Sequence, residues 1–403
     1  MRDLPHGWLR VFLKEVTEER MEKVGARKSI TVLSSTKHHG LVPSVEYFKG
    51  RTIYSDDLAN YKIVRRGWFA YATNHLAEGS IGLQEKLEEA CVSPIYTVFS
   101  TGVGVDPSFM FRALKSPRLL ASYAVHEQAS VDRRGAIRYK DFGKIEIDLP
   151  SECEQRRIAD ILNTLDRRVT SIDLSLDKFT LIHVGLIDYL LSSVVAGETP
   201  LRVHLAQSPK NGYSPKEVEG WTGLLALGLG CLTSGGFQAR QLKNVPMRDG
   251  RNRSALLSDG DLLMSRANTR DLVGLAGIYS GVGVPCIYPD LIMKLSPGGT
   301  CRAEYLELQL RSHGLRRQIQ AIAQGTSESM VKISGSSVQD LMVRIPSLEE
   351  QDRVLGVAHA SKAAIRRLEE ERNRLQLLKR GLMEDLLTGR VRVAQAEAIL
   401  ESL

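Results

Sequence analysis

The 403-residue sequence has little cysteine and lacks any cysteine pair at the spacing of a metal site. Its five cysteines are scattered and odd in number, and none belongs to a C-x-x-C motif. This pattern argues against a disulfide framework or a zinc ribbon and favours free thiols in a reducing compartment. The adjacent His38 and His39 are accompanied by no cysteine or carboxylate at ligand spacing, so we expect no metal site.

Long apolar segments are also missing. The N-terminal sequence MRDLPHGWLR contains no stretch that could act as a signal peptide. The longest nearly uncharged apolar run lies around Leu224–Leu232, far short of the roughly 20 residues that a membrane span needs. We therefore expect a cytoplasmic protein with no membrane association. A hydrophobic content of 43% and a charged content of 25% are typical of a folded chain, whose length suggests two or three domains.

The net charge of +7 is unevenly distributed along the chain. Residues 1–150 carry +4 and residues 201–345 carry +6, whereas residues 151–200 carry −3 and residues 346–403 are neutral. The basic excess therefore lies in two separate blocks, as expected if each block meets an anionic partner such as nucleic acid.

The sequence repeats itself at an offset of 196 residues. PSECEQRRIADIL from Pro150 matches PSLEEQDRVLGVA from Pro346, and strand-like segments before each proline extend the match. A second echo places Gly7-Trp8 over Gly220-Trp221, each followed by an apolar run. We interpret the chain as a tandem duplication in which each copy is a variable block followed by a similar tail.

Each tail is predicted to be one long helix. Apolar residues in the first tail recur at alternating steps of four and three, the spacing of a coiled-coil seam. The second tail has a less regular seam and ends at Thr388-Gly389, a natural helix stop. At 1.5 Å per residue, each helix would be about 55–65 Å long.

A helix of this length with one apolar stripe needs a partner, and its own duplicate is the obvious one. A parallel pairing stays open, but we prefer the antiparallel one because the two copies then make equivalent contacts at both ends. The polar seam residues His183, Arg372 and Lys379 could fix the register or form a solvated edge, and we favour the edge. The residues expected to pair are Ile158, Leu162, Leu165, Val169, Ile172, Leu176, Phe179, Ile365, Leu368, Leu375, Leu382 and Leu386.

The variable blocks consist of short strand-like segments broken by glycine and proline, with helices expected at Pro107–Lys115 and Ala303–Gln324. The predicted fold class is therefore mixed α+β. It has two similar α/β domains, joined by two long helices in an antiparallel coiled coil with pseudo-two-fold internal duplication. The predicted segments are a first domain (1–149), its helix (150–198), a second domain (199–345), its helix (346–393) and a tail (394–403).

This doubled pattern resembles the specificity subunits of type I restriction-modification systems. The helix openings, Leu149-Pro-Ser-Glu-Cys-Glu-Gln-Arg-Arg-Ile158 and Ile345-Pro-Ser-Leu-Glu-Glu-Gln-Asp-Arg-Val354, are similar to the opening of that family's conserved helices. The end of the second helix, Leu377-Leu-Lys-Arg-Gly-Leu-Met-Glu-Asp-Leu-Leu-Thr-Gly-Arg390, also resembles the family, as does the turn Gln324-Gly-Thr-Ser327. Gly7-Trp8 and Gly220-Trp221 look like the start of each target recognition domain. The resemblance covers essentially the whole chain.

The resemblance implies a non-catalytic subunit without cofactors. In that family each recognition domain reads one half of an interrupted, bipartite site in double-stranded DNA. The helices set the gap and dock two modification (methyltransferase) subunits, and restriction (motor-nuclease) subunits complete the complex. The sequence has no N-P-P-[YF], no glycine-rich loop for S-adenosylmethionine, no G-x-x-x-x-G-K-[ST] and no paired-carboxylate nuclease signature.

DNA binding requires cations for phosphates and bidentate donors or amides for base edges. An ordinary surface role is the commoner reading for any single candidate, but the clusters as groups point to DNA because they fall in the basic blocks. The candidates are Lys37, His38, Arg51, Arg65, Arg66, Asn74, Arg133 and Arg134 in the first block, and Arg240, Lys243, Arg248, Arg251, Arg253, Arg266, Asn268, Arg270, Gln324 and Thr326 in the second.

Two further observations leave alternatives open. Apolar residues off the seam either dock partner subunits or pack against the chain's own domains; they are Leu181, Ile182, Ile187, Leu191, Leu377, Leu378, Met383 and Leu387. The alternative function is a coiled-coil scaffold that joins two protein-binding domains without DNA specificity. The charge distribution favours DNA, since a scaffold has no reason to concentrate cations in the two variable blocks.

Overall fold

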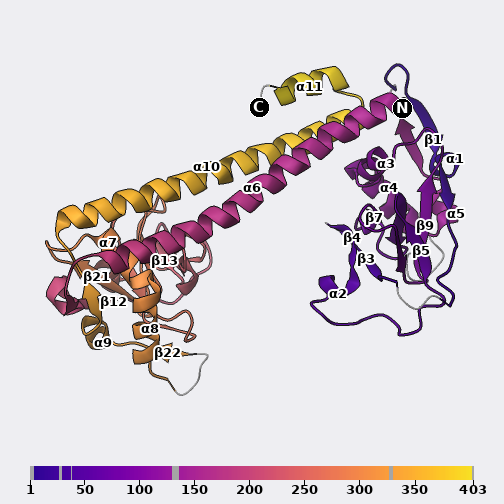
Figure 1. Ribbon diagram of the computed structural model, residues 1–403. Helices are drawn as coiled ribbons and strands as arrows, with labels where there is room; N and C mark the ends of the chain where they lie inside the picture. The colour runs from indigo at the N-terminus through magenta and orange to yellow at the C-terminus, as the bar shows by residue number, and fades with distance from the viewer. Residues whose placement is uncertain (1–3, 27–29, 38, 129–135, 326–329, 402–403) are drawn as a thin grey trace. The chain divides into compact units, whose positions relative to one another are not determined.

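The computed structural model describes residues 4–26, 30–37, 39–128, 136–325 and 330–401. The chain divides into two compact units, which are described separately. Unit 1 comprises residues 1–173 and 370–403, and unit 2 comprises residues 174–369. Two long helices, α6 (Glu152–Ser193) and α10 (Leu348–Leu387), contribute to both units (Figure 1). Within the described residues, no helix has both the length and the apolarity to cross a bilayer.

Unit 1 is built around an antiparallel sheet in the order β2-β9-β6-β7. Three two-stranded ladders, β1-β10, β3-β4 and β5-β8, surround this sheet. The strands are β1 (Leu9–Phe12), β2 (Thr17–Glu19), β3 (Leu33–Thr36), β4 (Gly40–Pro43), β5 (Lys62–Arg65), β6 (Trp68–Ala72), β7 (Ile81–Leu83), β8 (Glu89–Val92), β9 (Tyr96–Thr101) and β10 (Glu146–Leu149). The helices are α1 (Leu13–Val16), α2 (Ser44–Tyr47), α3 (Pro107–Leu114), α4 (Pro117–Gln128), α5 (Tyr139–Phe142) and α11 (Val393–Glu401).

Unit 2 follows the same plan around a sheet in the order β12-β21-β17-β19, with the smaller sheets β11-β23, β16-β13-β20, β14-β15 and β18-β22. Its strands are β11 (Glu198–Pro200), β12 (Leu205–Asn211), β13 (Leu225–Leu227), β14 (Leu232–Thr233), β15 (Gly236–Phe237), β16 (Leu242–Asn244), β17 (Leu262–Ser265), β18 (Ala267–Asn268), β19 (Ala276–Ile278), β20 (Cys286–Ile287), β21 (Ile292–Pro297), β22 (Val331–Lys332) and β23 (Met342–Arg344). Its helices are α7 (Ala303–Arg311), α8 (His313–Ile322) and α9 (Gly335–Gln339), with 3₁₀ turns η1 (Leu201–His204), η2 (Leu229–Cys231) and η3 (Gly250–Ala255).

The duplication extends into the variable blocks, where sequence identity is low. A Cβ atom on Gly82 of β7 would lie 2.4 Å from the backbone nitrogen of Leu41. A Cβ atom on Gly277 of β19 would lie 2.4 Å from the backbone nitrogen of Phe237. In both units, therefore, a hairpin packs backbone to backbone on the edge strand of the main sheet, an approach that only glycine permits. The mixed fold class and the internal duplication are confirmed.

Two sequence interpretations need correction. The segment Ala303–Gln324 forms two helices, because Ser312 adopts an extended conformation and its hydroxyl caps Leu315 of α8. The echo of Gly7-Trp8 at Gly220-Trp221 does not mark equivalent positions. Trp8 is buried before β1, and its indole donates to Glu154, whereas Trp221 is exposed and lies after β12. The ladder equivalent to β1-β10 is β11-β23, which starts some twenty residues earlier.

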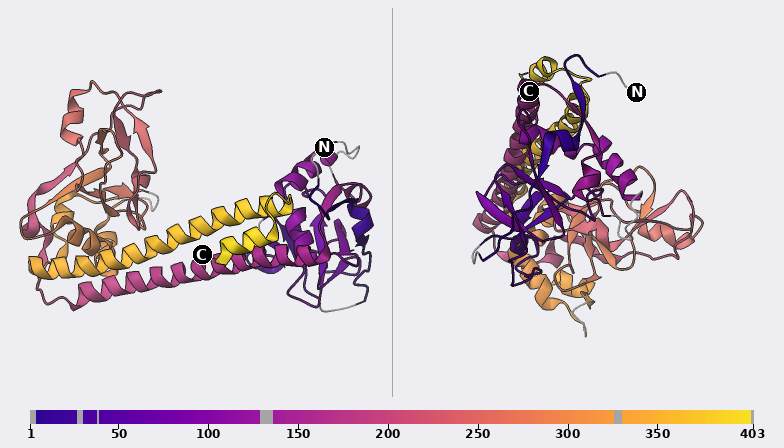
Figure 2. Two further views of the ribbon diagram at one scale, coloured as in Figure 1. Left: turned by 90° about the horizontal axis from the view of Figure 1, so that it is seen from above. Right: turned by 90° about the vertical axis from the view of Figure 1, so that its right-hand side faces the viewer.

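The two long helices pack antiparallel, as expected. In unit 1, Asp166 pairs with Lys379 and Asp173 pairs with Arg372, so seven residues forward along α6 correspond to seven residues backward along α10. In unit 2, His183 Nδ1 lies 2.6 Å from Ser361 Oγ. The three polar seam residues thus bridge the helices, as expected if they fix the register, and all three are half-buried, so part of each side chain also meets solvent. Figures 1 and 2 show a half of α6 beside a half of α10 within each unit.

The apolar seam residues of unit 1 join the main core of that unit. Ile158, Leu162, Leu165, Leu375, Leu382 and Leu386 are buried there with Phe69 and Phe99, whose rings stack at 4.9 Å. Val169 and Ile172 pack against the same core. In unit 2, Leu176 is buried, Ile365 and Leu368 are half-buried, and Phe179 is 43% exposed. Each fully buried leucine contributes about 1.5–3 kcal/mol, so the seam in unit 1 is a substantial part of its stability.

Candidate nucleic-acid interface

The clearest basic surface of unit 2 is the loop around η3. Its cations Arg248, Arg251 and Arg253 are all exposed, and Met247 beside them is 60% exposed. The loop is held in place by the buried Asn252, whose side-chain amide donates to the carbonyl of Pro246 at 2.7 Å. A short anchored turn that presents three guanidinium groups is suited to contacts with phosphates.

A second network orients Arg251. Its backbone N–H donates to the Asp249 carboxylate at 3.0 Å, and its guanidinium lies 5.5 Å from the centre of the Tyr213 ring. The Tyr213 hydroxyl donates to the same carboxylate at 2.7 Å. This hydrogen bond and that of the Arg251 N–H lower the pKa of Asp249, so the carboxylate stays ionised and holds the turn.

A second cluster forms where β18 pairs with β22. Asn268 lies on β18, and Gln324 pairs its backbone with Lys332 through hydrogen bonds of 2.9 and 2.8 Å. The backbone carbonyl of Arg266 accepts from Ile333 at 2.9 Å. The fold thus brings together two segments that are far apart in sequence. They carry the carboxamides of Asn268 and Gln324 and the cations Arg266 and Lys332. Carboxamides are the side chains best suited to reading adenine in the major groove.

Arg270 has a different position from its neighbours in the sequence. Its guanidinium donates to the carbonyls of Gln320 and Ala323 at 2.9 and 3.4 Å, which satisfies the C-terminal carbonyls of α8. We therefore assign Arg270 a role in fixing the helix end. Arg240 and Lys243 are exposed near β16, and Lys243 pairs with Glu217 at 2.8 Å.

In unit 1, Lys37 is exposed after β3, and Arg51 is exposed in the segment that follows α2. The backbone carbonyl of Lys37 accepts from the ammonium group of Lys115 at 2.8 Å. Burial, together with nearby Arg112, lowers the pKa of Lys115 to about 8. Asn74 lies half-buried in the turn after β6. Three further candidates of this unit, His38, Arg133 and Arg134, lie outside the described residues, as does Thr326 of unit 2.

Arg65 and Arg66 are surrounded by carboxylates. Arg65 pairs with Glu22 at 2.9 Å and with Glu89 across the β5-β8 ladder at 3.5 Å. Arg66 pairs with Glu88 at 2.9 Å. These partners offset the charge that a phosphate contact would use, so the two arginines are weaker candidates than the η3 arginines.

The sequence patterns missed several residues. The ring centre of Trp68 lies 5.3 Å from the Arg20 guanidinium and 5.4 Å from that of Arg65. Lys332 is exposed on β22. Tyr213 was missed because its contact with the η3 loop joins positions far apart in the chain. A count of charge by block contains Arg20 and Lys332, but only the strand pairing shows which neighbours they have.

The helices carry a separate apolar surface. In unit 2, one side of α6 exposes Leu174, Leu181, Ile182 and Tyr189, with exposed fractions between 51% and 74%. Of the other residues considered for partner docking, Leu377 is 64% exposed, Leu378 and Met383 are partly buried, and Ile187, Leu191 and Leu387 are buried. Both possibilities left open by the sequence therefore apply, each to different residues. The buried residues pack within the chain, and the exposed ones are available to a partner.

No protein-family model matches the chain. Solved structures do. A chain from a structure concerned with the assembly and conformational transition of the type I restriction-modification system matches with a TM-score of 0.60 and 18% identity, covering 97% of this chain and 100% of its own.

The HsdS subunit from Thermoanaerobacter tengcongensis matches with a TM-score of 0.53 and 16% identity, covering 97% of this chain and 99% of its own. The type I restriction-modification S subunit from M. genitalium matches with a TM-score of 0.52 and 12% identity, covering 96% and 98%.

These similarities define the class of fold: a duplicated α/β domain with two antiparallel connecting helices. It is the fold of the S subunits of type I restriction-modification systems, and this chain has it along nearly its whole length. The resemblance inferred from the helix openings is thereby confirmed at the level of the fold.

Proposed function

We propose that this chain is the DNA-reading specificity subunit of a type I restriction-modification complex. It binds double-stranded DNA at a bipartite, interrupted site, and each recognition domain reads one half. The observation that carries the proposal is the duplicated fold of S subunits combined with a basic excess confined to the two variable blocks. In unit 2, the η3 arginines are the proposed phosphate contacts, and Asn268 and Gln324 are the proposed base readers.

In this proposal the chain has no catalysis of its own and acts in the cytoplasm. Two modification subunits supply methylation, and restriction subunits supply cleavage. The exposed apolar side of α6 in unit 2 supports partner docking there, because surfaces of this kind mark interaction sites. The proposed division is recognition domains at 1–149 and 199–345, spacer helices at 150–198 and 346–393, and a tail at 394–403.

The proposal is tested by sequencing the methylome of cells that carry this chain and its modification subunit. We expect methylated adenines in a two-part motif with a fixed gap. An insertion of one heptad after Val169, matched by one at the facing position of α10, should lengthen the gap or abolish methylation. Methylation of a continuous motif, or an unchanged gap in the lengthened variant, would contradict the proposal. Absence of any methylation signal would favour the scaffold instead.

A further inference from the structure

The duplicated ladders β1-β10 and β11-β23 differ at one edge. The repeat offset superimposes Glu146 on Met342 and Ser122 of α4 on Gln318 of α8. The same backbone hydrogen bond continues both ladders. The Leu13 N–H donates to the Ile145 carbonyl in unit 1, and the Leu201 N–H donates to the Leu341 carbonyl in unit 2. Because bonded and non-bonded pairs alternate in antiparallel ladders, the backbone N–H and C=O of Glu146 and of Met342 point away from the partner strand.

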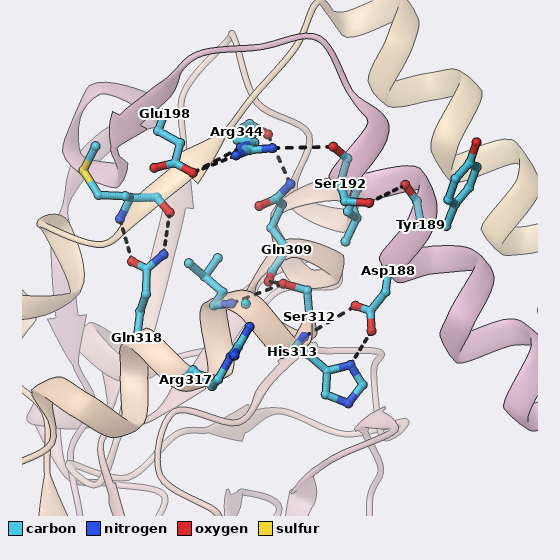
Figure 3. Close-up of a pocket in the computed structure, with 14 residues that line it drawn as sticks. Asp188, Tyr189, Ser192, Glu198, Gln309, Ser312, His313, Arg317, Gln318 and Arg344 are labelled. Atoms are coloured by element: carbon cyan, nitrogen blue, oxygen red, sulfur yellow. Dashed lines mark hydrogen bonds and ion pairs between the residues drawn. The ribbon is translucent and has the colours of Figure 1, made fainter.

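In unit 2 a side chain satisfies this edge. The Met342 N–H donates to Gln318 Oε1 at 3.1 Å, and Gln318 Nε2 donates to the Met342 C=O at 3.3 Å (Figure 3). The next outward carbonyl, that of Arg344, accepts from the Tyr305 hydroxyl at 3.3 Å and from Gln309 at 3.2 Å. Three side chains therefore satisfy the outward backbone groups of Met342 and Arg344 in β23.

In unit 1 all three of these side chains are replaced. At the equivalent positions of the repeat, Ser122 replaces Gln318, Phe109 replaces Tyr305 and Ala113 replaces Gln309. Phe109 and Ala113 carry no polar group, and the Ser122 hydroxyl makes no bond to Glu146 within the described part of the chain. A cavity of about 330 Å³ adjoins this edge of β10, lined by Phe12, Arg118, Leu119, Ser122, His126, Lys144, Ile145 and Glu146. A second cavity, of about 230 Å³, touches Ala113 and Asp148 and shares Arg118 and Leu119 with the first. In unit 2 a cavity of about 460 Å³ adjoins β23, and its lining includes Gln318 and Met342 (Figure 3). The two units therefore differ in the side chains that meet the strand edge, and both have a cavity beside it.

The chemistry of the edge selects its ligand. A backbone N–H and C=O on one residue need an acceptor and a donor side by side, which a carboxamide provides and an ionised carboxylate does not. The cations at the cavity are largely offset, since Arg118 pairs with Asp148 and Lys144 pairs with Asp141 at 2.7 Å. A neutral group therefore suits the cavity better than a charged one. Gln318 in the duplicate shows this ligand in place.

We infer that the outer edge of β10 is a binding site for the carboxamide side chain of a glutamine or asparagine on a protein partner. Phe12, which is 39% exposed, would pack on the aliphatic stem of that residue or on its neighbours. The cavity is larger than one such side chain, so it has room for the flanking residues of a polypeptide. The partner's identity, the modification subunit, rests on the proposed function; the site itself does not. The two units are then unequal toward a carboxamide, because Gln318 already bonds both backbone groups of Met342 in β23.

The site is tested first within the chain itself. Ser122→Gln should install the missing carboxamide, slow deuterium exchange of the Glu146 amide and raise Tm by roughly 1–4 °C. Ser122→Glu introduces a side chain of the same shape as glutamine but without the N–H donor. It should neither slow exchange of the Glu146 amide nor raise Tm. Gln318→Ser is the matched variant of unit 2 and should lower Tm by a similar amount. If Ser122→Gln exchanges at Glu146 as fast as the wild type, the cavity does not take a carboxamide and the inference is overturned.

The second arm measures binding of the purified modification subunit to the full chain. Ser122→Gln should weaken binding at least tenfold because its own side chain fills the site, and Gln318→Ser should bind as the wild type does. Unchanged affinity of Ser122→Gln, with its Tm raised, would overturn the inference and leave the proposed function intact. Failure of the wild-type chain to bind the modification subunit at all would contradict the proposed function itself.

Discussion

Gln155 and Gln351 occupy equivalent positions of the repeat and make the same three hydrogen bonds. Gln155 Oε1 accepts from the Asp106 N–H at 2.9 Å, and its amide donates to the carbonyls of Gly104 and Pro150 at 3.2 and 2.9 Å. Gln351 accepts from the Arg302 N–H at 2.8 Å and donates to Thr300 and Pro346, both at 2.9 Å. Both side chains are buried. Each one ties the start of a long helix to the loop before α3 or α7.

Replacement of either glutamine should be costly. Gln155→Ala or Gln351→Ala leaves one donor and two acceptors without their partner and opens a cavity, which together should lower the free energy of unfolding by about 2–4 kcal/mol. Urea unfolding followed by circular dichroism measures this change. Gln376→Ala, at an exposed position of α10, is the control and should change stability by less than about 0.5 kcal/mol. Equal effects of the buried and exposed replacements would show that the hydrogen bonds contribute little.

The two ladders also carry the same ion pair with its charges reversed. Arg10 lies opposite Asp148 in β1-β10, at 2.7 Å, and Glu198 lies opposite Arg344 in β11-β23, at 3.0 Å. Pairing of a strand with the duplicate of its partner would oppose like charges, which is unfavourable across a ladder. The reversal therefore favours correct pairing within each copy.

The pKa of Asp148 makes this pair sensitive to pH. Burial alone would raise the pKa, but hydrogen bonds and charge from Arg10 and Arg118 outweigh it and hold the pKa below its usual 3.8. A carboxylate with a lowered pKa stabilises the folded state above the unfolded value, and this stabilisation is lost as the pH falls through the folded value. The stability difference between wild type and Asp148→Asn should therefore be full at pH 7 and shrink below pH 3.8. Urea unfolding from pH 7 to pH 3 measures it.

Asp56→Asn is the matched control for this pH series, because Asp56 is exposed. It should give no comparable pH-dependent difference. A difference between wild type and Asp148→Asn that stays constant down to pH 3 would contradict the assignment.

The close-approach glycines give a further prediction. Gly82→Ala and Gly277→Ala each place a methyl group against a backbone nitrogen and should lower stability by about 1–3 kcal/mol. Gly185→Ala is the control, since a Cβ atom there meets nothing within 4 Å and lies in a helix. That replacement should stabilise by up to about 1 kcal/mol. Thermal unfolding of the three variants measures these changes. If Gly277→Ala were as stable as the wild type, the close packing of β15 on β19 would be contradicted.

The η3 loop makes a quantitative prediction for DNA. If Arg251 and Arg253 contact phosphates, their joint replacement by alanine should reduce the slope of log affinity against log salt by about 1.8. The matched control is Arg65→Ala with Arg66→Ala, which removes two arginines already paired with carboxylates and should change the slope less. Fluorescence anisotropy over a salt series gives both slopes. Equal slopes for wild type and the η3 variant would remove the loop from the interface.

The sequence predicted the long helices because helical periodicity is local. It favoured their antiparallel pairing because two copies of one repeat then make equivalent contacts at both ends. It did not predict which cations are free. Arg65 meets Glu22 and Glu89 only after strands pair, and Arg270 caps a helix fifty residues away. The match of Gly7-Trp8 with Gly220-Trp221 gave a wrong start for the second domain, because two residues carry no information on which strands pair. The ladder β11-β23, which shows the true equivalence, forms only in the folded chain.

The most direct test of the account is exchange of residues 201–345 for the corresponding block of an S subunit with a different known site, followed by methylome sequencing. The account predicts that one half of the methylated motif changes to that of the donor while the other half and the gap stay the same. A motif that is unchanged by the exchange, or altered in both halves, would contradict the claim that each block reads its own half-site.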